Sequence, residues 1–148
     1  MKDNCAVIIP SIKLDNDAAK CIKECLKQKY VKVKIYLVTN HKVKKKLKYK
    51  NIIYLSYGDI NMSEKRNKAV RKCKEKYIAF IDSDAYPEKL WLNNAIKILK
   101  KNKTVGMVTG PDFPFKNQKG WSRYIAQAHK SFLLSGTKVF RKNVKKAN

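Results

Sequence analysis

Short apolar runs alternate along the chain with longer segments in which apolar side chains recur every three or four residues. Runs this short suit buried strands, and the longer spacing suits helices that pack one face against a sheet. We therefore expect strands at 5–10, 31–40, 51–57, 77–81 and 104–110. Helices are expected at 14–29, within 58–76, at 87–102 and at 121–134, with room for a further short helix in the basic connector 41–50.

This alternation predicts an α/β fold: a Rossmann-like, doubly wound, mainly parallel sheet with right-handed crossovers. Sheets of this kind bind ligands at the carboxyl ends of their strands. The length of 148 residues suits one domain, so we expect 1–148 to form a single domain.

The predicted helices carry their own start signals and buried faces. Asp15 or Asn16 can cap the first helix, and Pro87 suits the first position of the helix at 87–102, where its missing N–H costs nothing. The inward face of the first helix is predicted to hold Ala18, Cys21, Ile22, Cys25 and Leu26. The helix within 58–76 is predicted to turn Met62, Ala69, Val70 and Cys73 inward.

The net charge of +24 first suggests a nucleic-acid partner. However, only four of the 35 basic residues are arginines, which supply the bidentate contacts of base and phosphate readers, and the lysines are spread over every segment. We therefore expect no specific nucleic-acid partner, but a surface that favours anionic partners, including peripheral contact with an anionic membrane.

No apolar run approaches the roughly 18 residues of a membrane span, so a cytoplasmic protein is expected, with any membrane contact peripheral. The four cysteines form no C-x-x-C pair. Cys21 and Cys25 are four residues apart and share a helix face, which would allow a zinc site but favours small buried thiols.

The strand at 77–81 runs directly into two carboxylates, Asp82 and Asp84, at what should be the ligand-binding edge of the sheet. Two carboxylates this close raise each other's pKa unless a cation intervenes. Mg²⁺ or Mn²⁺ suits such a site, because these ions take one or two carboxylates and share the rest of their shell with substrate phosphates. An Asp-x-Asp turn can also be solvated, and Asp84 could instead cap the helix that follows.

Three stretches, in order, resemble the inverting, GT-A-fold glycosyltransferases of family two. "VIIPSIK" (7–13) resembles that family's first strand, and "VGMVTGPDFPF" (105–115) resembles a later strand with its acceptor-side loop. The most specific stretch is "INMSEKRNKAVRKCKEKYIAFIDSDAYPEKLWLNNAI" (60–96), which resembles the family's R-N helix, its D-x-D motif and the following helix.

The resemblance implies a nucleotide-diphosphate-sugar donor, bound by 1–110, and a hexosyl transfer to an acceptor hydroxyl. Asp84 would ligate a divalent Mn²⁺ or Mg²⁺, and Asp82 would contact the ribose or the metal shell. The remaining donor-site residues implied by the family motifs are Pro10 and Ser11, through their backbone in the nucleoside pocket, and Arg66 and Asn67, which would bind the donor or brace its pocket.

Two departures from the family pattern affect the site. Where the family has an acidic turn that holds the base, this chain has Thr39, Asn40 and His41. Asn40 can donate and accept hydrogen bonds, so we expect it to read a base edge. The family's catalytic base is an acidic residue far beyond the D-x-D motif, and here no Asp or Glu follows Asp112, which is a weak candidate.

The chain thus resembles the donor-binding part of such an enzyme, with 111–148 as the start of the acceptor-side region and truncation before the base. We expect the isolated chain to transfer sugar slowly or not at all. The alternative is a non-catalytic donor-binding remnant, or half of a split glycosyltransferase that a separate C-terminal half completes. The acceptor would be a glycan, a lipid-linked molecule or a small molecule.

Other classes fit less well. A nucleotidyltransferase would need a glycine-rich phosphate loop after the first strand, and "PSIKLDND" contains no glycine. A phosphatase with an Asp-x-Asp nucleophile would carry that pair after the first strand rather than the fourth. A basic nucleic-acid module would show clustered arginines and interleaved aromatic residues, which this chain lacks.

Overall fold

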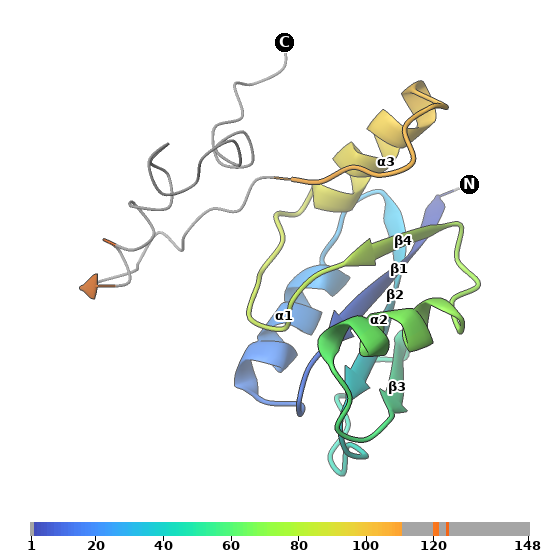
Figure 1. The fold of residues 1–148 in the computed structure, drawn as a ribbon. Coiled ribbons are helices and arrows are strands. Elements are labelled where there is room, and N and C mark those ends of the chain that lie inside the picture. The colour runs from blue at the N-terminus through green and yellow to red at the C-terminus, as the bar shows by residue number, and fades with distance from the viewer. Residues whose placement is uncertain (1, 111–119, 122–123, 125–148) are drawn as a thin grey trace. The chain divides into compact units, whose positions relative to one another are not determined.

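Four parallel strands form the sheet, in the order β3–β2–β1–β4 (Figure 1). The computed structural model describes residues 2–110, 120, 121 and 124. The strands are β1 (Asp3–Pro10), β2 (Val31–Thr39), β3 (Ile52–Ser56) and β4 (Tyr77–Phe80). The helices are α1 (Asn16–Leu26), α2 (Met62–Val70) and α3 (Trp91–Lys101). The predicted α/β class and the parallel, doubly wound sheet are confirmed.

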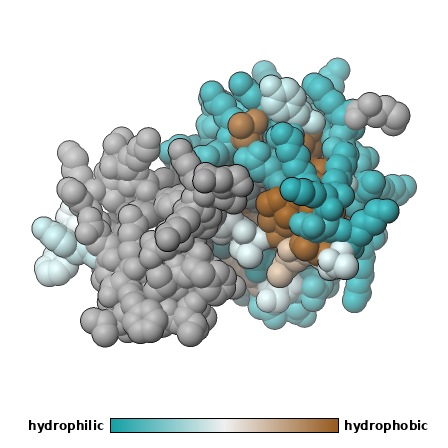
Figure 2. All heavy atoms as spheres, turned by 90° about the horizontal axis from the view of Figure 1, so that it is seen from above, coloured by the Kyte–Doolittle hydropathy of each residue, from teal (hydrophilic) through white to brown (hydrophobic). Residues whose placement is uncertain are grey.

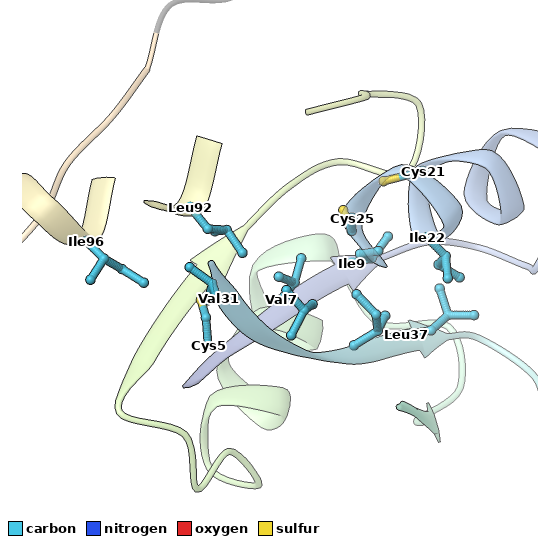
Figure 3. Packing of buried hydrophobic residues seen from close by; sticks show 12 residues of the cluster. Cys5, Val7, Ile9, Cys21, Ile22, Cys25, Val31, Leu37, Leu92 and Ile96 are labelled. Atoms are coloured by element: carbon cyan, nitrogen blue, oxygen red, sulfur yellow. The ribbon is translucent and has the colours of Figure 1, made fainter. Parts of the chain in front are cut away.

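The core lies on both faces of the central strand β1, which pairs with β2 on one side and β4 on the other. On one face, apolar side chains of β1 and β2 pack against α1 and α3, and Figure 3 shows Leu92 and Ile96 of α3 beside Cys5 and Val31. On the other face, Ala6, Ile8, Tyr36 and Val38 surround Ala69 of α2. Helices therefore cover both faces of the sheet, as double winding requires.

Two helices begin at side-chain caps. Asp15 accepts a 2.9 Å hydrogen bond from the backbone N–H of Ala18 and so caps α1, as predicted. At the start of α2, Asn61 accepts from the backbone N–H of Glu64 at 2.9 Å and donates to the Glu64 carboxylate at 3.0 Å. Caps of this kind contribute about 1 kcal/mol each, and here they fix where both helices start below the carboxyl edge of the sheet.

Three sequence-based expectations about these elements are wrong. Residues 104–110 form no strand: Met107 is 81% exposed, and two glycines weaken any strand that lacks a partner. The basic connector 41–50 forms bends rather than a helix. The third helix begins at Trp91 with Leu90 as its N-cap, so Pro87 precedes the helix instead of opening it, and Asp84 is not its cap. The helix expected at 121–134 lies almost wholly outside the described residues.

Strand β4 is less buried than its apolar sequence suggests. It lies at one end of the described sheet, and it alternates half-buried and exposed residues. Ile78 and Phe80 are 40% and 48% exposed, because α2 covers β1 and β2 rather than β4. The continuous apolar run at 77–81 therefore marks a strand with one uncovered face.

The chain divides into two compact units, Met1–Lys103 and Thr104–Asn148, and all labelled elements belong to the first. On the face of this unit seen in Figure 2, hydrophilic side chains predominate, with a few apolar ones showing between them. Of the helices in the described part of the chain, none has the length and hydropathy that a membrane span requires.

Candidate functional site

The carboxyl ends of β1 and β2 are joined to each other by backbone hydrogen bonds. The N–H of Ser11 donates to the carbonyl of Val38 at 2.9 Å, and the N–H of Asn40 donates to the carbonyl of Ile12 at 3.1 Å. These bonds hold the Pro10–Ser11 backbone beside Asn40. The structure therefore brings together three of the predicted nucleoside-pocket residues, and all three are buried.

Beneath these strand ends lies Lys65, whose side chain is 1% exposed and which sequence reasoning missed. Its ammonium donates a 2.8 Å hydrogen bond to the carbonyl of Ser11 and a second, short one to Oδ1 of Asn40. Within the described part of the chain no carboxylate lies at ion-pair distance from Lys65. The buried charge is thus satisfied by neutral oxygens of both strand ends.

The side chain of Asn40 has a fixed orientation, because its two neighbours are chemically unambiguous. An ammonium can only donate, so Oδ1 faces Lys65, and a carboxylate can only accept, so Nδ2 donates to Asp59 Oδ1 at 2.8 Å. Asn40 is itself only 8% exposed. Its amide is held inside the protein at both ends, and the exposed group next to it is the Asp59 carboxylate.

The loop that carries Asp59 is tied to the end of β2. The N–H groups of Tyr57 and Gly58 donate to the carbonyls of Thr39 and Asn40, at 3.3 Å and 2.9 Å. Gly58 has a φ of 77°, a left-handed conformation that side chains rarely adopt. The turn at Gly58 therefore returns the chain so that Asp59 meets Asn40.

At the end of β4, Arg66 of α2 reaches Asp82. Nη2 of the Arg66 guanidinium lies 2.5 Å from Asp82 Oδ1, and the two side chains are 30% and 67% exposed. Two residues predicted for the site, 16 positions apart in sequence, thus form an ion pair. Asn67, the next residue on α2, is exposed. Within the described residues, its side chain forms no hydrogen bond with another predicted site residue.

The Asp82–Asp84 turn is anchored from below and from the side. The carbonyl of Asp82 accepts from the N–H of Ala85 at 3.0 Å and from the Cys21 thiol of α1 at 3.5 Å. Tyr86 donates to an oxygen of Asp17 at 2.8 Å, and its ring lies under the ammonium of Lys20. Burial and the hydrogen bond to Asp17 raise the pKa of Tyr86 to about 12, so at neutral pH it remains a donor.

This turn offers hard oxygen donors to a cation. Asp82 and Asp84 are both exposed at the carboxyl edge, and Arg66 already neutralises part of the charge of Asp82. In the described part of the chain, no three His, Cys, Asp or Glu side chains converge into a metal cage. The donor set therefore fits an ion such as Mn²⁺ or Mg²⁺ that takes one or two carboxylates and completes its shell with phosphate and water.

The cysteines lie in or beside the core rather than at the site surface. Cys5, Cys21 and Cys25 are buried, and Cys73 is partly buried. Burial raises the pKa of Cys5 to about 12 and that of Cys73 to about 11. A hydrogen bond with Cys21, together with burial, raises the pKa of Cys25 far above its ordinary value. These three thiols therefore stay protonated at neutral pH, which disfavours them as nucleophiles.

Among the residues that the sequence pointed to, His41 is exposed at the turn after β2, and its carbonyl accepts a 2.8 Å hydrogen bond from the Thr39 hydroxyl. Asp112 lies outside the described residues. Lys65 and Asp59 were missed, although one signal existed for Lys65. It lies three residues after Met62 and four before Ala69, on the face already predicted to point inward.

Comparison with known proteins identifies the family. A family model for glycosyl transferase family 2 matches residues 6–147. Among solved structures, S. aureus TarS 1-349 is similar with a TM-score of 0.64 at 18% identity, over 79% of this chain and 37% of that chain. S. aureus TarS gives a TM-score of 0.62 at 20% identity, over 79% and 23%. TarS 1-349 in complex with UDP-GlcNAc gives 0.62 at 19% identity, over 79% and 36%.

No curated protein matches the chain significantly. The chain spans little more than a third of the TarS 1-349 structure, at most 37% of its length. The likeness to these structures confirms the predicted GT-A glycosyltransferase fold. Because the family model extends over nearly all of the sequence, the chain belongs to glycosyl transferase family 2.

Proposed function

We propose that the chain binds a nucleotide-diphosphate sugar at the carboxyl edge of its sheet, together with Mn²⁺ or Mg²⁺, for transfer of a hexosyl group to an acceptor hydroxyl. One observation carries the proposal. The ends of β1, β2 and β4 meet at one edge, so the Pro10–Ser11 backbone and Asn40 lie beside the anchored Asp82–Asp84 turn. A nucleoside and a diphosphate need an arrangement of this kind, with one subsite for each.

The residues have separate tasks in this proposal. The backbone of Pro10 and Ser11 lines the nucleoside pocket, and Asp84 offers its exposed carboxylate to the cation that accompanies the diphosphate. Arg66 holds Asp82 in place through their 2.5 Å contact and adds positive charge where phosphate oxygens would lie. The cation, when bound, supplies Lewis-acid stabilisation of the leaving diphosphate.

Two further observations support a nucleotide-sugar donor. The chain belongs to glycosyl transferase family 2, and two similar TarS structures are complexes with UDP and with UDP-GlcNAc. The net charge of +24 also raises the local concentration of any polyphosphate near the surface. We extend the proposal to a cytoplasmic location, with peripheral contact to anionic membranes that the same charge would favour.

The test is calorimetric titration of the chain with UDP-GlcNAc and with UDP, in Mn²⁺ and in EDTA. Binding is expected only with the metal, and Asp84→Ala should weaken it by about tenfold or more, the size of a lost charge-assisted contact. The matched control is Asp3→Ala, which also removes one carboxylate but from the opposite, amino end of β1, where Asp3 pairs with Lys100. Equal binding by the parent and Asp84→Ala would refute the proposed metal site.

A further inference from the structure

The base-reading residue that we expected, Asn40, is bound to the protein at both ends of its amide. Its oxygen accepts from buried Lys65, and its nitrogen donates to Asp59. Because Lys65 is 1% exposed and Asn40 is 8% exposed, a ligand cannot reorient this pair without breaking buried hydrogen bonds. The group that this arrangement presents outward, next to the nucleoside pocket, is the carboxylate of Asp59.

Two hydrogen bonds and one backbone turn keep the Asp59 carboxylate in position. Nδ2 of Asn40 donates to its Oδ1 at 2.8 Å, the Gly58 N–H donates to the Asn40 carbonyl at 2.9 Å, and Gly58 turns the chain with a φ of 77°. A carboxylate has two oxygens and about four acceptor positions. Holding one oxygen therefore leaves the other able to accept from a ligand.

We propose that Asp59 selects the nucleobase of the donor, accepting a hydrogen bond from a ring N–H and so favouring keto bases such as uracil and guanine. This inference rests on the proposed function. An ionised carboxylate can only accept hydrogen bonds. Uracil and guanine carry a ring N–H on the pairing edge, whereas cytosine and adenine present a ring nitrogen lone pair there, which a carboxylate repels.

The buried series of hydrogen bonds behind Asp59 explains why the difference in affinity between bases would be large. The positive charge of Lys65 polarises Asn40, and Asn40 in turn donates to Asp59, so the three groups form one hydrogen-bonded series from the core to the surface. Preorganised acceptors of this kind lose little on binding, and an unmatched base would leave the carboxylate desolvated without a donor.

The experiment measures the Mn²⁺-dependent affinities of UDP, GDP, CDP and ADP by calorimetry. The tighter of UDP and GDP is expected to exceed both CDP and ADP by about ten- to hundred-fold, the range for a hydrogen bond to a charged group. In Asp59→Asn, which still accepts from Asn40 but can also donate, this preference should fall to about threefold or less. Glu64→Gln is the matched control, since it removes one charge nearby without contacting Asn40, and it should keep the preference.

The outcomes separate this inference from the proposed function. If all four nucleotides bind the parent equally with Mn²⁺, or if Asp59→Asn keeps the full preference, the role of Asp59 is refuted while the donor site stands. If no nucleoside diphosphate binds the parent in a metal-dependent way, the proposed function fails and the inference fails with it. Circular dichroism of Asp59→Asn, expected to match the parent, verifies that the comparison is between folded proteins.

Discussion

The guanidinium of Arg66 lies 2.5 Å from a carboxylate oxygen of Asp82, and this contact joins helix α2 to the turn that follows β4. Two carboxylates at one turn need a nearby cation, and Arg66 is a permanent one for Asp82. Asp84 is exposed as well, and in the proposed function its carboxylate would take the ligand cation.

Replacing Arg66 should therefore weaken donor binding much more than it weakens the fold. Asp82 is 67% exposed, and exposed ion pairs contribute only about 0–1 kcal/mol to stability. Arg66→Ala is expected to lower Mn²⁺-dependent UDP affinity by about tenfold or more, with a small change in the free energy of unfolding. Titration and urea unfolding of the same samples measure both. Arg71→Ala, at the C-cap of the same helix, is the control, and an equal loss of affinity there would mean that only surface charge matters.

Lys65 should be important for folding stability. Lys65→Met keeps an unbranched side chain that matches the apolar stem of lysine but leaves the Ser11 carbonyl and Asn40 Oδ1 without their donor. Each buried acceptor left unsatisfied costs about 1–3 kcal/mol, so the free energy of unfolding in urea should drop by that amount or more. The comparison variant is Lys72→Met, whose residue is exposed. A Lys65→Met protein as stable as the parent would show that the buried charge itself was the larger cost.

Glu75 should make the free energy of unfolding depend on pH in the acid range. Burial alone would raise its pKa, but hydrogen bonds from Tyr36 and from the Lys74 N–H, together with the charge of Lys34, outweigh burial and hold the pKa below the ordinary 4.5. A carboxyl with a lowered folded-state pKa stabilises the fold above 4.5, and this contribution disappears as the pH falls through the folded value.

The free energy of unfolding should therefore decline as the pH is lowered below about 4.5, and the decline should be shallower in Tyr36→Phe, which lacks the donating hydroxyl. Urea unfolding at a series of pH values measures both slopes. Tyr54→Phe, which removes a hydroxyl that accepts from the Leu47 N–H, serves as the control. Identical slopes in the parent and Tyr36→Phe would exclude this hydrogen bond as the cause.

Binding to anionic surfaces should be strong at low salt and should vanish as salt rises. The net charge of +24 is the reason, and screening acts beyond about 8 Å at physiological ionic strength. Co-sedimentation with vesicles containing phosphatidylserine, against vesicles of phosphatidylcholine alone, measures this at increasing NaCl. Retention at high salt would instead require an inserted apolar group, for which exposed Trp121 is a candidate.

Much of the fold follows from apolar periodicity. The buried face of α1 was predicted residue by residue: Ala18, Cys21, Ile22 and Cys25 are fully buried, and Leu26 packs at the edge of the same cluster. The cap at Asp15 and the four parallel strands also follow, because their signals lie within a few neighbouring residues. Sequence patterns whose structure depends on a partner far away in the chain were less reliable predictors of secondary structure. Residues 104–110 look like a strand, yet strand formation requires a neighbouring strand to pair with.

The candidate site, like the fold, was predictable where its signals are local in sequence and was missed where they depend on distant residues. A turn with two carboxylates after a strand is visible in the sequence, and so is the R-N pair on α2. Lys65 was missed although it lies on the predicted inward face of α2, because a lysine is normally interpreted as a surface charge and its burial depends on acceptors 54 and 25 positions away. Asp59 was missed for a similar reason: its importance comes from Asn40, which lies 19 positions earlier in the chain.

The thiol of Cys21 lies against the carbonyl of Asp82, under the turn that carries both site carboxylates. A buried thiol reacts with an alkylating reagent only when the protein opens, so its labelling rate measures how often that opening occurs. Cys73, partly buried and three residues beyond the end of α2, gives an internal comparison in the same molecule. The labelling rate of Cys21 thus reports on the rigidity of the Asp82 turn. A ligand that stabilises this turn will slow labelling of Cys21 while leaving labelling of Cys73 nearly unaffected.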